Sequence, residues 1–278
     1  MLKESNKSIQ ITSNIWMKWF VKWLSYVVVK WTKKKFVGED SDREGLGLSY
    51  GQDAVISALA KANKNLIVVN ISGNAIAMPW VNEVPAIVQD WYLGSEAGSA
   101  LAAILMGDVN PSGKLPFTFP VKLEDCPAHS LGEYTGKRSK DIIDIKYNES
   151  IFVGYRWADK QKKVKPLFPF GHGLSYTTFE YGKPTADSKT MQADGTLTVK
   201  VSVKNTGARE GQEVVQLYIS DKKSSLPRPV KELKGFQKVK LAPGETKEVT
   251  FTIERRLLAS SMTPSTLGWP SRVSSRLS

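Results

Sequence analysis

Apolar residues follow a mixed helix and strand pattern in the first half of the chain. Residues 52–62 carry apolar side chains at helical spacing, which predicts a helix. Residues 66–71 form a continuous, mostly β-branched run, typical of a strand buried on both faces. A second short apolar element covers residues 84–90, and small residues predict another helix within residues 94–106. This order predicts a layered α/β domain with a mostly parallel sheet.

In a parallel sheet of this kind, ligands lie beyond the carboxyl ends of the strands. Those ends lead into the loops Asn70–Asn74 and Trp91–Glu96. We therefore expect the functional part of the α/β domain to be at these loops.

In the second half of the chain, apolar and polar residues alternate with a period of two. Residues 197–204 alternate in polarity, and further short strands are expected at 214–219, 231–239 and 248–253. Turn residues separate these segments. Short strands spaced in this way predict an all-β sandwich.

An aromatic stretch, residues 147–179, lies between the two parts. It starts with a strand-like run, Ile151–Val153, and two prolines exclude a helix through residues 166–170. Gly171 and Gly173 permit backbone angles that other residues resist. From the residues alone, this stretch reads as a packed aromatic linker between two domains.

The charge of the chain is concentrated at its ends. The 278 residues carry a net charge of +12, of which residues 1–36 hold +7 and residues 254–278 hold +3. The remaining body is nearly neutral, which argues against a nucleic-acid groove. One cysteine, Cys126, and two histidines, His129 and His172, make a metal site improbable, and we expect no other cofactor. We interpret both histidines as structural or surface residues.

The two termini differ from the rest of the sequence. Residues 1–36 contain four tryptophans, but lysines interrupt the apolar run, which argues against a membrane span and against a secretory signal. An interfacial amphipathic helix is physically possible. We favour a segment foreign to the fold. Residues 259–278 are serine-rich without alternation, so we expect a disordered tail and an incomplete last domain.

Four motifs give the sequence a specific resemblance. Residues 147–179, Pro79-Trp80, residues 107–116 and residues 228–236 closely resemble glycoside hydrolase family 3 of the bacterial β-glucosidase kind. The resemblance covers roughly residues 37–258. It implies an α/β sandwich domain at residues 37–178 and a fibronectin type III-like domain at residues 185–258.

An acidic segment, residues 38–44, contains the candidate catalytic residue. Its residues alone indicate a solvated loop before a helix. The family resemblance implies that Glu39, followed by Asp42-Arg43, is the general acid/base, although Asp40 stands where relatives usually have glycine. A neighbouring carboxylate could raise the pKa of Glu39, as an acid requires, or could crowd the loop.

The resemblance also limits what the 278 residues can do. Retaining glycosidases need a second carboxylate about 5 Å from the first, as nucleophile. In the family, that aspartate lies on a (β/α)8 barrel that precedes this region, and residues 1–36 leave no room for a barrel. We expect a fragment that hydrolyses terminal β-D-glucosyl residues of a β-glucoside or oligosaccharide only when the barrel is present.

Two other functions stay open. The same two domains could form a non-catalytic carbohydrate-binding or accessory module, and the N-terminal segment could bind a membrane surface, which we rank lower. Four aromatic residues could stack on sugar or pack in the interior, and we assign none of them: Trp80, Trp91, Tyr155 and Trp157. Because no signal peptide is recognisable, localisation is not assigned.

Overall fold

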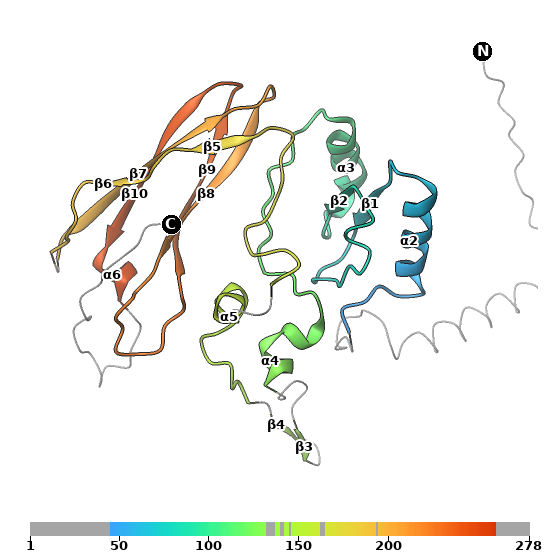
Figure 1. Ribbon diagram of the computed structural model, residues 1–278, viewed down its shortest axis with the longest axis horizontal. Coiled ribbons are helices and arrows are strands. Elements are labelled where there is room, and N and C mark those ends of the chain that lie inside the picture. Colours follow the sequence, from blue (N-terminus) through green and yellow to red (C-terminus); the bar gives the residue numbers. More distant parts are fainter. Residues whose placement is uncertain are drawn as a thin grey trace, which may run out of the picture.

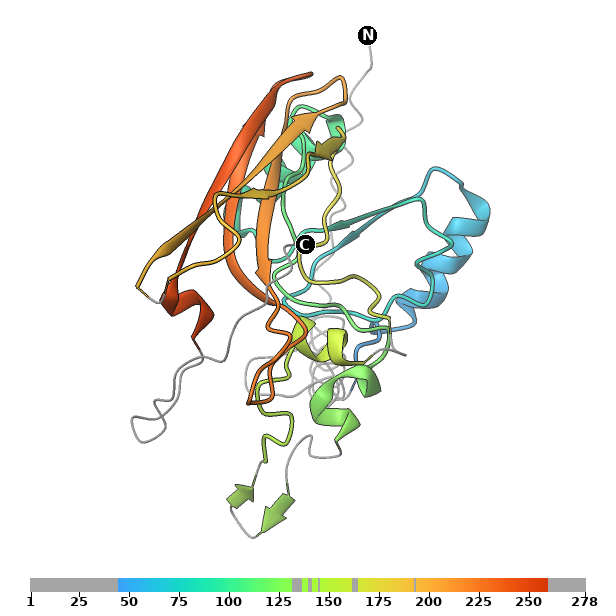
Figure 2. The same cartoon turned by 60° about the vertical axis from the view of Figure 1, so that its left-hand side comes forward.

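The structure is a computed structural model that describes residues 45–131, 137–139, 142–144, 146–161, 165–192 and 194–259. The expected foreign segment, residues 1–36, and the tail from residue 260 onward lie outside these ranges. Figure 1 shows an α/β part on one side and a β-strand part on the other, and in Figures 1 and 2 the β3–β4 hairpin extends away from both. Among the described residues, no helix has the length and apolarity needed to cross a bilayer.

The α/β part contains the elements that its periodicity predicts. Helix α2 (Gln52–Ala62) is followed by strand β1 (Ile67–Asn70) and strand β2 (Ala86–Gln89), which pair in parallel. A short 3₁₀ turn, η1 (Gly94–Glu96), then leads into helix α3 (Ala97–Met106). The two strands are in register, with Asn70 opposite Gln89 at their carboxyl ends.

The core of this part is built around Trp80, which is fully buried with Ile76 and Phe119. The Trp80 indole N–H donates to the carboxylate of Asp53, 2.7 Å away, and so ties α2 to the loop after β1. Our prediction that β1 is buried on both faces was wrong, because Ile67 at its start is 49% exposed. The two central residues of β1 are half-buried, and Asn70 at its end is buried.

The region that joins the two parts is made of short elements. They are η2 (Leu123–Asp125), α4 (Pro127–Ser130), β3 (Lys137–Ser139), β4 (Ile142–Asp144) and α5 (Tyr155–Lys160).

The strand-like reading of Ile151–Val153 was wrong, because these residues form a turn that leads into α5. Ser150 and Gly154, which flank them, both have positive φ, and this prevents an extended run.

The proline-rich stretch after α5 forms a loop, as predicted. Phe168 makes an isolated antiparallel bridge to Phe119, and Gly171 has a φ of +81°. A Cβ on Gly173 would overlap the carbonyl oxygen of Gly113, so close backbone approach explains the second glycine.

The second part is a pair of antiparallel sheets. In one, β7 (Thr196–Asn205) pairs with β10 (Thr246–Glu254), β5 (Phe179–Tyr181) and β6 (Thr185–Ala186). In the other, β8 (Gly211–Ile219) pairs with β9 (Glu232–Leu241). Helix α6 (Arg255–Leu258) follows β10. The sheets pack face to face, since Val203 and Val249 of the first share a buried cluster with Val215 and Leu241 of the second.

Asn205, at the end of β7, is fully buried and ties the first sheet to the loops around it. Its side-chain oxygen accepts hydrogen bonds from the Thr177 hydroxyl at 2.6 Å and the Gly207 N–H at 3.1 Å. Its amide nitrogen donates to the carbonyl oxygens of Arg209 at 2.7 Å and Leu241 at 3.1 Å. Because buried polar groups need hydrogen-bond partners, this amide holds the end of β7 against Thr177, the turn after β7 and the end of β9.

Candidate functional site

The carboxyl ends of β1 and β2 carry a network of amide and hydroxyl groups. The buried Asn70 side-chain amide donates to the Gln89 side-chain oxygen and, at 3.0 Å, to the Ser72 hydroxyl. Gln89 in turn donates to the Ser72 carbonyl oxygen at 3.3 Å, and the Ser72 hydroxyl donates to the Asn74 carbonyl oxygen at 2.8 Å. This network holds the loop after β1 in one conformation.

The loop after β2 is fixed by aromatic packing. Trp91 has a φ of +52°, which is uncommon for a large side chain, and its ring packs edge-on against Phe117 with centroids 5.4 Å apart. The next residue, Tyr92, is 68% exposed, and its ring lies 2.7 Å from where a Cβ on Gly73 would be. The two loops therefore meet through a tyrosine ring that covers a glycine.

The first described residues lie beside the loop after β1. The Ala77 N–H donates to the Leu46 carbonyl oxygen at 2.8 Å, so the segment that enters α2 runs beside the loop after β1. Glu39, the candidate acid/base, is six residues before Gly45 and lies outside the described residues.

Of the four aromatic residues left unassigned, two are interior. Trp80 is fully buried, and Trp157 is 7% exposed with its indole N–H donating to the Asp125 carbonyl oxygen at 2.9 Å. Trp91 is half-buried against the core and Tyr155 lies between the two domains. Tyr92, an exposed ring, lies in the loop Trp91–Glu96 that the sequence indicated, but sequence reasoning did not single it out as a residue.

His172 has a structural environment. Its ring stacks on Phe168 with centroids 5.0 Å apart, and its carbonyl oxygen accepts a hydrogen bond from the Leu115 N–H. Burial, with a contribution from the Lys114 charge, lowers the pKa of this histidine, so the imidazole is neutral at neutral pH. His129 lies on α4. Within the described ranges, no three His, Cys, Asp or Glu side chains form a group that could hold a metal ion.

The aromatic stretch identified in the sequence forms one side of a polar joint between the two domains. Asn110 accepts hydrogen bonds from the Ser175 hydroxyl and the Tyr176 N–H, and it donates to the Glu210 carbonyl oxygen at 2.9 Å. Close by, the ammonium group of Lys114 lies 3.1 Å from the carboxylate of Glu213.

A second cluster in the joint is centred on Glu232, at the start of β9. Its carboxylate is 2.8 Å from Arg228, 3.5 Å from Arg156 of α5 and 3.5 Å from Lys234. Burial alone would raise the pKa of Glu232, but the hydrogen bond from Arg228 and the neighbouring positive charges outweigh it and lower the pKa. The cluster therefore holds an ionised carboxylate against three cations.

Tyr155 adds an aromatic contact to this joint. Its ring stacks on Phe170 with centroids 5.2 Å apart, and its hydroxyl oxygen accepts a hydrogen bond from the Leu233 N–H at 2.9 Å. The aromatic linker was predicted from the residues, but the ion pairs across it were not.

Comparison with known proteins places these two parts in one family. A model of the glycosyl hydrolase family 3 C-terminal domain matches residues 24–176, more than half of the chain. The chain belongs to glycosyl hydrolase family 3. A fibronectin type III-like domain matches residues 213–266 of the same family 3 chain.

The relatives of this family 3 chain are named β-glucosidases. It is 58% identical over 222 residues to a β-glucosidase of Bacteroides ovatus, and this match covers 79% of the chain and 29% of the relative. A thermostable β-glucosidase of Acetivibrio thermocellus is 44% identical over 225 residues, with 81% and 29% covered. The chain thus spans about 29% of the length of the curated relatives it matches.

Solved structures agree. A β-glucosidase from Streptomyces venezuelae, in complex with D-glucose, is 46% identical with a TM-score of 0.71, and the match covers 78% of this chain and 27% of that one. A β-glucosidase 3B from Thermotoga neapolitana, in complex with glucose, is 36% identical with a TM-score of 0.71, covering 79% and 30%.

Proposed function

We propose that this chain is the C-terminal part of a retaining β-glucosidase, a glycoside hydrolase that removes terminal non-reducing β-D-glucosyl residues. The observation that carries the proposal is the 58% identity, over 222 residues, to a relative named β-glucosidase. The glucose bound in the Streptomyces venezuelae structure supports a glucoside or oligosaccharide substrate.

The finer description of the domains is part of this proposal. The parallel pairing of β1 and β2, with α2 and α3 beside it in sequence, supports a layered, mostly parallel α/β sandwich over residues 37–178. The two antiparallel sheets support a fibronectin type III-like, immunoglobulin-like domain over residues 185–258. Because the domain matches extend from residue 24 to residue 266, only residues 1–23 and 267–278 are then appendages to these two domains.

We assign the general acid/base role to Glu39. Six residues of chain span at most about 20 Å, and Gly45 is next to Leu46, whose carbonyl oxygen binds the loop after β1. The assignment thus rests on the family resemblance and on the closeness in sequence of Glu39 to the segment that runs beside the loop after β1. Ligands of open parallel sheets bind beyond the carboxyl ends of the strands, where this loop lies.

The nucleophile has to come from elsewhere in the whole enzyme. Retention requires a second carboxylate about 5 Å from the acid/base, and we expect it on the barrel domain that precedes this region in whole family members. The 278 residues alone then supply the acid/base but no catalytic nucleophile. They are therefore inactive by themselves.

The test is hydrolysis of nitrophenyl β-glucoside by the 278-residue chain, alone and mixed with a separately expressed family 3 barrel domain. We expect activity only in the mixture and a loss of at least 100-fold with Glu39→Gln, the order that general acid catalysis supplies. Glu44→Gln, the same change five residues away, is the matched control and should keep activity.

Other outcomes identify what is wrong. Hydrolysis by the chain alone would contradict the division of the two carboxylates between domains. Activity in the mixture that Glu39→Gln leaves intact would refute the assignment of Glu39. Binding of cellobiose without hydrolysis in any mixture, unchanged by Glu39→Gln, would favour the alternative, a non-catalytic carbohydrate-binding module.

A further inference from the structure

Tyr92 carries an aromatic ring in the loop that follows β2. The side chain of Tyr92 is 68% exposed, whereas Asp90 is buried and Trp91 is half-buried. Single exposed rings are common on protein surfaces. What distinguishes this ring is the way in which the protein holds it.

The backbone on either side of Tyr92 has an uncommon conformation. Trp91 has a φ of +52° and Gly94 a φ of +74°. The Trp91 ring packs edge-on against Phe117 and Phe119, with centroids 5.4 Å and 6.1 Å apart. A large residue keeps a positive φ only where its surroundings impose it, and such residues gather at ligand sites. The core therefore fixes the direction in which Tyr92 projects.

The Tyr92 ring meets the loop after β1 with one edge. The ring atoms nearest to the position of a Cβ on Gly73 are Cε2 at 2.7 Å, and Cδ2 and Cζ at 3.5 Å. These three atoms form one edge of the ring, and the outer two are clearly farther away, as in an approach from the edge. Gly73 therefore supports the edge and leaves the faces of the ring uncovered by this loop.

Polar side chains flank the ring on both loops. Asn74 follows Gly73, and Ser95 lies three residues after Tyr92. Both are exposed, and no described residue hydrogen-bonds either side chain. A pyranose ring needs an aromatic face for its C–H groups and polar partners for its hydroxyls, and these two loops offer both.

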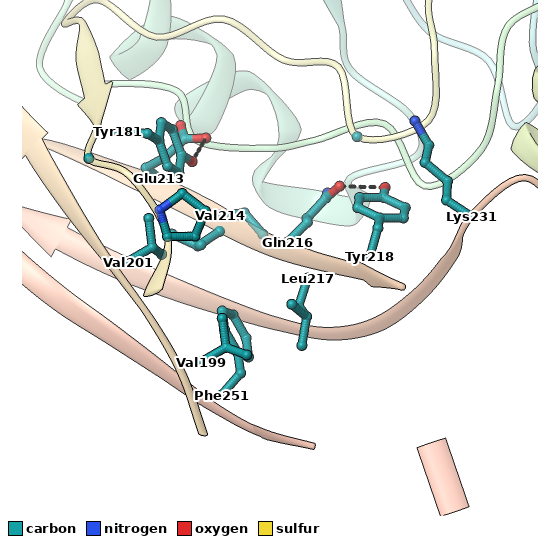
Figure 3. Close-up of a pocket in the computed structure, with 14 residues that line it drawn as sticks. Tyr181, Val199, Val201, Glu213, Val214, Gln216, Leu217, Tyr218, Lys231 and Phe251 are labelled. Carbon is teal, nitrogen blue, oxygen red and sulfur yellow. Dashed lines mark hydrogen bonds between the residues drawn. The ribbon is translucent and has the colours of Figure 1, made fainter. Parts of the chain in front are cut away.

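A cavity of about 550 Å³ along β8 offers a sugar fewer partners (Figure 3). Glu213 accepts a hydrogen bond from the Tyr181 hydroxyl at 3.0 Å and lies 3.1 Å from Lys114. Gln216 accepts a hydrogen bond from the Tyr218 hydroxyl at 2.7 Å. Sugar hydroxyls in this cavity would compete with bonds that the protein already makes, so we do not assign a sugar to it.

The catalytic groups indicate which part of the substrate lies at Tyr92. The proposed function gives this chain the general acid, Glu39, and places the nucleophile on another domain. A general acid protonates the leaving-group oxygen. The loops of the domain that carries the acid therefore face the leaving group.

We propose that Tyr92 is a stacking platform for the sugar ring of the leaving group and so determines which leaving groups are preferred. The inference rests on the proposed function, because the acid defines the side of the substrate. The ring face binds the C–H groups of the sugar, and Asn74 and Ser95 bind its hydroxyls.

The test compares two substrates in the mixture of the 278-residue chain with a family 3 barrel domain. Cellobiose has a glucose leaving group, whereas β-glucosyl fluoride has a leaving group without a ring. Tyr92→Leu should lower kcat/KM for cellobiose about ten-fold, the order that an aromatic stacking contact supplies. It should leave kcat/KM for β-glucosyl fluoride unchanged, and Tyr92→Phe, which keeps the ring, should retain most of the cellobiose activity.

Tyr147→Leu is the matched control. Tyr147 is 77% exposed and belongs to neither of the two loops. The same change there should leave kcat/KM for both substrates unchanged.

A binding measurement separates this inference from the proposed function. The tyrosine rings of the 278-residue chain are isotopically labelled, and the nuclear magnetic resonance signals that Tyr92→Leu removes belong to Tyr92. Cellobiose should shift these signals saturably in the chain alone, whereas sorbitol, which has hydroxyls but no ring, should not. This measurement needs neither barrel nor hydrolysis, so it decides the role of Tyr92 even if the mixture is inactive.

Three results would overturn the inference. The first is an equal loss of kcat/KM for both substrates in Tyr92→Leu. The second is no shift of the Tyr92 signals with cellobiose, or the same shift with sorbitol. The third is a shift of these signals on addition of the barrel domain that abolishes their response to cellobiose, which would make protein the neighbour of the ring.

Discussion

Glu232→Gln removes the negative charge at the centre of the interdomain cluster and keeps the shape of the side chain. The carboxylate accepts a hydrogen bond from Arg228 at 2.8 Å and has Arg156 and Lys234 each 3.5 Å away. A hydrogen bond to a charged group contributes about 1.5–3 kcal/mol. Partial solvent screening and the acceptor that glutamine retains reduce this, so we expect a loss of about 1.5–2 kcal/mol in the free energy of unfolding. The thermal midpoint should then fall by about 3–8 °C.

The pH dependence of this loss gives a second, independent measurement. Because the pKa of Glu232 is lowered in the folded chain, its contribution is complete above the unfolded pKa of about 4.3 and is lost as the pH falls through the folded pKa. Thermal unfolding is followed by circular dichroism for the unmodified chain and for Glu232→Gln. Their midpoints should differ at pH 7, and the difference should disappear as the pH falls below about 4.

The matched control is Glu248→Gln, the same change in the next strand along the chain, β10. Glu248 pairs with Lys200 at 2.8 Å, but its side chain is 57% exposed. Exposed ion pairs contribute little to stability, so its midpoint should hardly change. Equal losses in the two variants, or a Glu232→Gln difference that persists in acid, would refute the reasoning.

Three further changes test the joint and its surroundings. Gly173→Ala should destabilise the chain by about 1–3 kcal/mol in urea unfolding, because its Cβ would overlap a carbonyl oxygen, whereas Gly113→Ala, where the added Cβ meets nothing within 4 Å, should cost much less. Tyr155→Phe leaves the Leu233 N–H unpaired and should cost about 1–3 kcal/mol in the same assay, and an unchanged urea midpoint would contradict this. Burial, with the nearby Tyr155 and Asp159, raises the pKa of Tyr218 to about 12, so its stabilisation is complete below the unfolded pKa of about 10 and lost as the pH rises through about 12. In Tyr218→Phe, the free energy of unfolding should therefore fall less between about pH 10 and 12 than in the unmodified chain. The same alkaline fall in both proteins would contradict this.

Much of the fold could be predicted because the elements are long enough to show a period. The helix at Gln52–Ala62 and the strand at Thr196–Asn205 each carry a pattern over ten residues or more. Strands β5 and β6, with three and two residues, are too short to show one. Ile151–Val153 has strand composition, but the positive φ values on either side of it decide its conformation.

The candidate site was predictable only as a location. Parallel pairing of β1 and β2 places the two loops together, and this follows from topology, but the contact of Tyr92 with Gly73 depends on side-chain directions that no local pattern encodes. The ion pairs between the two domains could not be predicted from the sequence for a different reason. Lys114 and Glu213 are far apart in the sequence, so only the tertiary fold brings their charges together.

That separation in sequence has a consequence for synthesis of the protein on the ribosome. Asn110 and its partner Glu210 are 100 residues apart. At about 5–20 residues per second, Asn110 waits on the order of 5–20 s before that partner has been added to the chain. Once Tyr155 has been added, its ring likewise lacks the Tyr218 ring against which it packs until β8 has been made. The nascent α/β part is therefore exposed to chaperones and proteases until β8 and β9 emerge, and slow codons between residues 176 and 233 would lengthen the exposure.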